Sequence, residues 1–170
     1  MRFIAILAAA ALLTGCAIMP EADSPPPPQS VRFETTPCFG SCPVFVVTVS
    51  ADGHGTYEGG RFVKTKGTHE FTATPEQVRT FFARLRPFRP HGGKRYDYGH
   101  CPVPVATDSP SVDVRWIAPG GHDSLNWYLG CRVPELETIR PDLRNAWQEL
   151  PLDDLVGRAE NRFEYDRRGG

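Results

Sequence analysis

Cysteines are the residues with the most distinctive chemistry in this chain of 170 residues, which contains five of them. Cys16 ends an apolar run near the N-terminus, and the other four are Cys38, Cys42, Cys101 and Cys131. A thiol can be acylated, bind a metal, exchange electrons or form a disulfide, and its sequence context favours one of these. The surroundings of Cys16 bear on the compartment of the protein, and therefore on the chemistry of the other four.

The N-terminal segment predicts export and lipidation. A basic start precedes an apolar run at residues 3–13, which is too short for a membrane span of about 20 residues but fits a signal peptide. Residues 13–16 read Leu-Thr-Gly-Cys, which resembles the lipobox of bacterial lipoprotein signal peptides. That resemblance implies a signal peptide at residues 1–15 and acylation of Cys16, with palmitate among the acyl chains. The alternative is an ordinary secretory signal with a coincidental cysteine.

The residues after Cys16 indicate how the protein would be held at the membrane. Ala17 stands where an aspartate would resemble an inner-membrane retention signal, so we expect an outer-membrane anchor with the domain facing the periplasm. Residues 16–29 include a run of prolines at 25–28, which favours an extended polyproline II tether. A ligand for a proline-binding groove is the alternative for this segment.

Four remaining cysteines in an exported domain predict two disulfides, for which three pairings are possible. We favour Cys38–Cys42, whose members are adjacent in a turn, together with Cys101–Cys131. The spacings lack the CxxC pairs usual in zinc sites. Pro43 and a β-branched run follow Cys42, so no helix N-terminus activates a thiol for redox chemistry. We therefore predict no metal, no cofactor and no catalytic cysteine.

The long loop at residues 90–110 carries the remaining candidates for a site. Tyr98, His100 and Asp108 are candidate binding residues, and Asp97 stands beside them. A carboxylate and an imidazole together can perform general acid–base catalysis, so an envelope hydrolase using Asp97, His100 and Asp108 is the alternative function. Against it, no partner motif accompanies His100, and Asp108 fits a turn into the next strand.

Two further candidate binding regions follow from exposure and charge. The small Cys38–Cys42 loop would present Phe39 and Gly40 on a rigid turn, unless Phe39 tucks under the sheet as part of the core. Residues 79–95 contain several basic residues and no acid. Arg79 and Arg86 therefore form a candidate dock for anionic groups of the envelope. The alternative is a solvated helix face that is partly paired with acids near the C-terminus.

The pattern of apolar residues predicts an α+β fold with two helices on one face of a mainly antiparallel sheet of about five or six strands. Alternating or apolar runs indicate the strands, and residues 75–86 show helical spacing after a capping box. A last helical stripe begins at Leu136 and is interrupted by Pro141, which predicts two short helices or a kink there. Seven segments are candidates for these strands, at residues 31–35, 44–50, 55–58, 61–64, 69–72, 112–116 and 124–129. We place a single domain at residues 30–150 and a charged tail at 151–170.

The seven residues at 37–43 read Pro-Cys-Phe-Gly-Ser-Cys-Pro and precede a hydrophobic strand. The chain resembles a bacterial domain of unknown function whose hallmark is Pro-Cys-x-Gly-x-Cys-Pro. The similarity extends through residues 107–110 (Thr-Asp-Ser-Pro) to about Trp147. The resemblance implies a domain assignment and brings no known activity.

Charge excludes one class of partner. The chain has 19 Lys+Arg and 20 Asp+Glu, so nothing marks it as a nucleic-acid binder. We find no catalytic or phosphate-binding motif. The sequence therefore predicts a lipid-anchored envelope domain that binds an envelope protein or an anionic envelope polymer.

Overall fold

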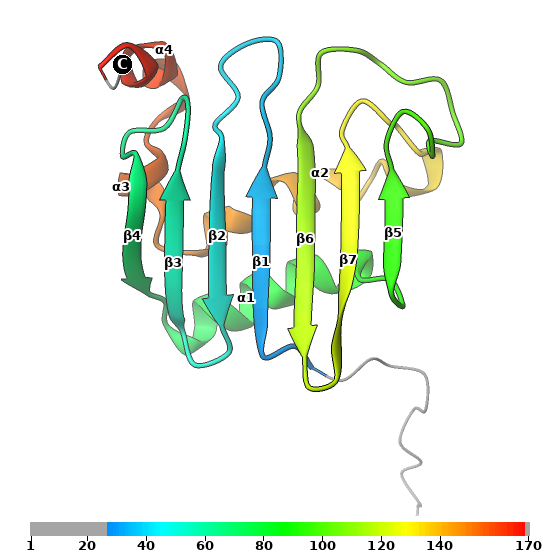
Figure 1. Cartoon of the computed structure of the whole chain (residues 1–170), viewed down its shortest axis with the longest axis horizontal. Coiled ribbons are helices and arrows are strands. Elements are labelled where there is room, and N and C mark those ends of the chain that lie inside the picture. Colours follow the sequence, from blue (N-terminus) through cyan, green and yellow to red (C-terminus); the bar gives the residue numbers. More distant parts are fainter. Residues whose placement is uncertain (1–26, 169–170) are drawn as a thin grey trace, which may run out of the picture.

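The computed structural model describes residues 27–168, and these form a seven-stranded sheet with helical segments behind it (Figure 1). The strand order is β4-β3-β2-β1-β6-β7-β5. Neighbouring strands are antiparallel except β5 and β7, which pair in parallel. The strands are β1 (Ser30–Thr35), β2 (Phe45–Ser50), β3 (His54–Gly59), β4 (Gly67–Thr72), β5 (Gly93–Tyr96), β6 (Ser111–Ala118) and β7 (Gly121–Tyr128). The α+β class and the largely antiparallel sheet are confirmed, with more strands than the five or six expected.

One face of the sheet holds the core and the other stays open. Along β1, Val31 and Phe33 are fully buried, while Arg32 and Glu34 point to the other face and form an ion pair at 2.7 Å. The same alternation runs through β2 and β6. An antiparallel sheet covered on one side shows this pattern, because successive side chains point to opposite faces.

The helix α1 (Pro75–Leu85) packs on the covered face. Thr74 caps it in the expected capping box with Gln77, and Pro75 occupies the start of the helix. Phe81 is fully buried and meets Phe33 of the central strand edge-to-face at 6.2 Å. Two orphan backbone N–H groups at the helix start are thus satisfied, and the apolar stripe faces the sheet.

Two parts of the sheet differ from the sequence-based expectation. Residues 61–64 form no strand. Val63 is instead fully buried, and the Lys64 amide donates to the Val156 carbonyl. The apolar pattern there reflects insertion into the core and not strand pairing. The strand β5 was missed because its residues alternate only weakly, and its pairing comes from the distant β7.

The C-terminal part forms several short helical segments, more than the two short helices or the kinked helix expected there. Pro141 is the second residue of α2 (Arg140–Asn145), so it starts this helix and does not interrupt it. The 3-10 turns are η1 (Arg86–Phe88), η2 (Pro134–Leu136), η3 (Ala146–Glu149) and η4 (Ala159–Asn161), and the last helices are α3 (Asp153–Val156) and α4 (Arg162–Arg167).

Packing continues beyond residue 150, where we expected a peripheral tail. Leu152 and Val156 are fully buried members of the hydrophobic core. The Tyr57 hydroxyl reaches toward the Leu155 carbonyl at 3.4 Å. The segment 151–156 therefore belongs to the folded unit, since removing it would uncover core side chains.

Both expected disulfides are present. The sulfurs of Cys101 and Cys131 are bonded, with Cα atoms 5.7 Å apart, and Cys131 is fully buried. The Cys131 carbonyl also accepts a hydrogen bond from the Trp127 indole at 2.9 Å. Because β5 occupies residues 93–96, the long loop expected at 90–110 is shortened to residues 97–110, and this bridge ties that 97–110 loop to the core. Among residues 27–168, no helix is long and apolar enough to span a membrane. The expected signal peptide and Cys16 lie outside the described residues.

Candidate functional site

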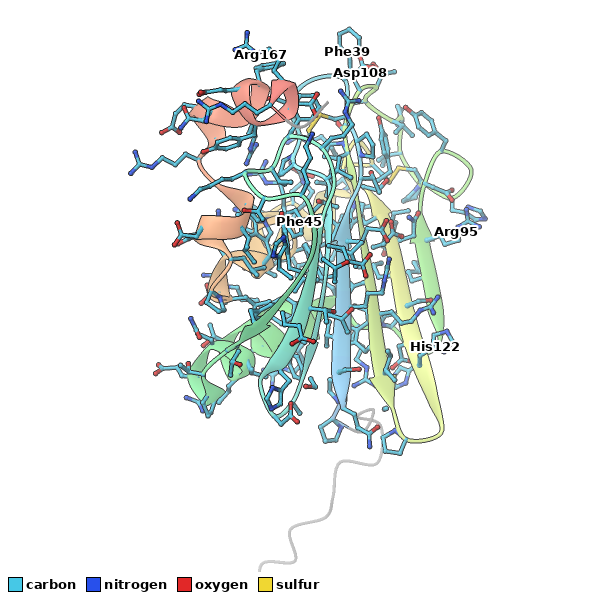
Figure 2. The ribbon with its side chains drawn as sticks, turned by 60° about the vertical axis from the view of Figure 1, so that its left-hand side comes forward. Phe39, Phe45, Arg95, Asp108, His122 and Arg167 are labelled. Carbon is cyan, nitrogen blue, oxygen red and sulfur yellow. A yellow bond between two sulfur atoms is a disulfide. The ribbon has the colours of Figure 1, made fainter. Side chains whose placement is uncertain are left out.

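The loop closed by Cys38 and Cys42 stands at one end of the sheet, and it carries the most exposed large apolar side chain among the described residues. Phe39 is 88% exposed, so the alternative that it plugs the core is wrong. Its backbone amide donates to the Asp108 carbonyl at 3.3 Å. Gly40 has φ +147°, a backbone conformation that favours glycine. Figure 2 shows Phe39 and Asp108 side by side at this end, far from His122 at the other.

Tyr98 joins the same end from the 97–110 loop. Its hydroxyl donates to the Tyr128 hydroxyl at 3.0 Å, and the two rings lie 4.7 Å apart. Tyr128 in turn accepts a hydrogen bond from the Ser109 amide at 3.1 Å. The hydrogen bond with Tyr128 raises the pKa of Tyr98. Tyr98 is nevertheless 64% exposed, so an aromatic surface remains open to a partner.

The three residues of the alternative hydrolase are only partly brought together. His100 Nδ1 lies 2.6 Å from Asp97 Oδ1, and this hydrogen bond is the main reason that the pKa of Asp97 is lowered. Asp108 instead accepts from Thr107 at 3.0 Å. Within the described residues, no hydrogen bond or ion pair links Asp108 to Asp97 or His100. His100 and Asp108 are both exposed, so these side chains lie open to solvent and do not form an enclosed group.

The basic candidates Arg79 of α1 and Arg86 of η1 lie away from this end, on the helical layer behind the sheet (Figure 1). Arg79 and Arg86 are exposed and border a shallow cavity with Phe82 and the first described residues, Pro27 and Pro28. Their neighbour Arg84 pairs with Glu149 at 2.7 Å. The expected pairing of this helix face with C-terminal acids thus occurs at Arg84. Arg79 and Arg86 do not form one surface with Phe39 and Tyr98.

A cavity of about 440 Å³ lies between both loops and the C-terminal segments. Cys42 and Pro43 line it from one loop, and Ser109 and Pro110 from the other. Its apolar lining is Val112, Leu129 and Trp147, and its charged lining is Arg140, Arg144 and Arg162. None of the described residues that line it is acidic. The cavity therefore combines an apolar wall with concentrated positive charge.

The three arginines differ in how well they are paired. Arg140 lies 2.9 Å from Glu137, which also pairs with Arg132 at 2.7 Å. Within residues 27–168, Arg144 makes only a long hydrogen bond, at 3.4 Å, to the side chain of its neighbour Asn145. Arg162 Nε is buried without a hydrogen-bond partner in the part of the chain that the structure describes. Burial lowers the pKa of Arg162, because charge is costly away from water.

Sequence reasoning missed these arginines. Arg140 and Arg144 are four residues apart on α2 and share a helix face, which is a signal that the sequence does contain. Arg162 has no such signal, since only packing brings α4 to the cavity. No group of three or more His, Cys, Asp or Glu side chains that could hold a metal occurs within residues 27–168.

Comparison with curated proteins and with solved structures found no match. Comparison with protein families did find one, over residues 29–146. That range contains both loops of the candidate end, Arg140 and Arg144, and it stops before Trp147 and Arg162. The match covers most of the chain, which therefore belongs to the family described as Domain of unknown function (DUF6438).

Proposed function

We propose that this protein is a lipid-anchored binding module of the bacterial cell envelope. In this proposal Cys16 carries the lipid, the outer membrane holds it, and the domain faces the periplasm. The proline-rich tether enters the domain at Gln29, whose amide donates to the Ile117 carbonyl at 2.7 Å. The end that carries Phe39 lies at the opposite end of the sheet. An anchor at one end would thus present the other end to the periplasm.

The observation that carries the proposal is the exposure of Phe39 on a pre-organised loop. A disulfide closes that loop, and a hydrogen bond to the Asp108 carbonyl holds it. A rigid loop loses less conformational entropy on binding than a flexible one, and aromatic side chains often dominate contact energy. Binding is favoured over hydrolysis because Asp97, His100 and Asp108 form no enclosed cluster.

A photo-activatable cross-linking residue in place of Phe39, in living cells, tests the partner contact. We expect a specific adduct from position 39, whose mass identifies a protein or an envelope polymer. His122 is exposed at the other end of the sheet and is the matched control position. Equal adducts at both positions, or none at position 39, would contradict the contact.

Anchoring has a separate test. Replacing Cys16 by Ser should release the protein from membranes or block its processing, because the thiol is the expected acylation site. Membrane fractionation and the intact mass of the mature chain measure this. An unchanged mass and unchanged membrane attachment would overturn the lipid anchor and leave the contact at Phe39 to be judged on its own.

A further inference from the structure

The positive charge of the cavity is not balanced by the residues around it. Arg140 and Arg132 share the single carboxylate of Glu137, and Asp142 and Glu149 both pair with Arg84. Arg144 and Arg162 thus face the cavity with no carboxylate partner within residues 27–168. Such an excess of guanidinium groups beside a partly enclosed space attracts an anion.

The buried part of Arg162 is the sharpest sign of a missing ligand. Its Nε atom is shielded from water and has no hydrogen-bond partner among the described residues. A buried unsatisfied donor destabilises the fold, more so when the group is charged. Arg162 as a residue lines the cavity, so an oxyanion there would pair with its guanidinium charge and offset the cost of burying part of that group. Guanidinium groups suit this role because their planar donors match the two oxygens of a carboxylate.

The shape and lining of the cavity define the rest of the ligand. Its volume of about 440 Å³ lies in the range of small-molecule sites. Trp147 and Leu129 supply an apolar wall, and Ser109 and Asn145 supply neutral hydrogen-bonding groups. A ligand with one charged end and an apolar body fits this division. A monoanion is favoured over a phosphate dianion, because desolvation costs rise with charge.

We propose that this cavity binds the carboxylate group of a small organic acid with an apolar body, through Arg162 and Arg144. This site goes beyond the contact proposed for Phe39, which does not line the cavity. The two ideas therefore fail separately. Phe39→Ala should leave binding of a small acid unchanged, and loss of the acid site should leave the adduct at position 39 in place.

The test compares two probes of matched shape on the purified full chain, N-acetylphenylalanine and its C-terminal amide, by ligand-observed NMR titration. We expect the acid to bind about 10- to 100-fold more tightly than the amide, as a charge-assisted hydrogen bond predicts. Arg162→Gln should remove most of that preference. Arg167→Gln is the matched control, because Arg167 lies on the same short helix and is exposed outside the cavity.

Inorganic phosphate is the third probe, and Arg144→Gln is a second variant in case Arg162→Gln does not fold. Circular dichroism checks the fold of each variant. Equal binding of acid and amide, or no binding of the acid, would overturn the site. Acid binding that persists in both folded variants would also overturn it. Phosphate binding tighter than the acid would overturn the assignment of a carboxylate.

Discussion

Phe39 and Phe45 lie six residues apart in the same stretch but have opposite surroundings (Figure 2). Phe45 is 1% exposed, stacks on Tyr57 at 5.7 Å and meets Trp147 edge-to-face at 5.4 Å. Phe39 is 88% exposed and its ring has no aromatic contact in the described chain. Only Phe45 stabilises the fold through apolar burial. Phe39 leaves apolar surface in water, which favours a role in contact with a partner.

The two disulfides repeat this difference. Cys131 is fully buried, and its bond to Cys101 closes a separation of 30 residues, whereas Cys38 and Cys42 are half-buried and four residues apart. Closing a long loop removes more entropy from the unfolded chain than closing a short one. The Cys101–Cys131 bridge, like Phe45, therefore mainly stabilises the fold. The Cys38–Cys42 bridge mainly shapes the surface loop that carries Phe39.

Phe45→Ala should have the largest effect on stability. Truncating a buried phenylalanine removes apolar contacts and leaves a cavity, which costs about 3–5 kcal/mol. Tyr57 and Trp147 would each lose a ring contact. Urea denaturation followed by tryptophan fluorescence measures the loss. A change in the free energy of unfolding below about 1 kcal/mol would be typical of a surface residue, and the contrast between Phe45 and Phe39 would then fail.

Replacing Cys101 and Cys131 together by Ala should be the next most damaging change. Chain entropy predicts a loss of about 3.7 kcal/mol for this bridge, with further cost because Cys131 is packed in the core. Denaturation of the double variant under the same conditions gives the value. Stability equal to that of the parent chain would show that the packing of the 97–110 loop does not need the bond.

Removing the Cys38–Cys42 bridge in the same way should cost less. The chain-entropy estimate for its small loop is about 2 kcal/mol, and neither cysteine is fully buried. The matched experiment is the Cys38→Ala, Cys42→Ala double variant beside the Cys101→Ala, Cys131→Ala one. If the short bridge proved the more stabilising of the two, the Cys38–Cys42 loop would serve mainly to stabilise the fold. The proposal that it holds Phe39 in place for contact with a partner would then have to be abandoned.

Local signals explain what the sequence could predict. The capping box at Thr74, the alternation in β1, β6 and β7, and the even number of cysteines each depend on neighbouring residues. The sequence does not decide whether Phe39 is exposed, because residue type alone favours burial. In the structure the side chain is 88% exposed, and the backbone of this loop is held by the Asp108 carbonyl, which is far away along the chain.

Non-local packing explains what the sequence could not predict. The strand β5 exists because β7 offers it an edge, and Val63 is buried in a loop because residues 155–156 hold that loop. The cavity is lined by Arg162 of α4 and by Cys42 of a loop far away along the chain. No pattern within a single segment carries such information, since each partner lies far away along the chain.

Lowering the pH should loosen the 97–110 loop, at the end of the sheet that carries Phe39, without affecting the core. The hydrogen bond from His100, together with Arg95 and the Gly99 amide, lowers the pKa of Asp97 below its ordinary value. A lowered folded-state pKa stabilises the fold above the ordinary pKa, and this is lost as the pH falls through the folded value. The Gly99 amide, which donates to Asp97 at 3.0 Å, should then shift in an NMR titration.

The control for this titration is the Phe45 amide, which donates to the Thr35 hydroxyl at 3.3 Å and has no titrating partner. Asp97→Asn should remove the acidic step at Gly99 and leave the Phe45 amide unchanged. A step of equal size at both amides would mean that acid loosens the whole fold, and the two regions would then not be independent.

Phe39→Ala should have the smallest effect on stability, within about 0.5 kcal/mol of the parent chain, as for most surface substitutions. Its ring is 88% exposed, so truncation removes little buried area and opens no cavity. The backbone hydrogen bond from residue 39 to the Asp108 carbonyl does not depend on the side chain. Denaturation beside Phe45→Ala measures the difference directly. A loss of several kcal/mol would show that the ring packs in solution, and the proposed partner contact would lose its main support.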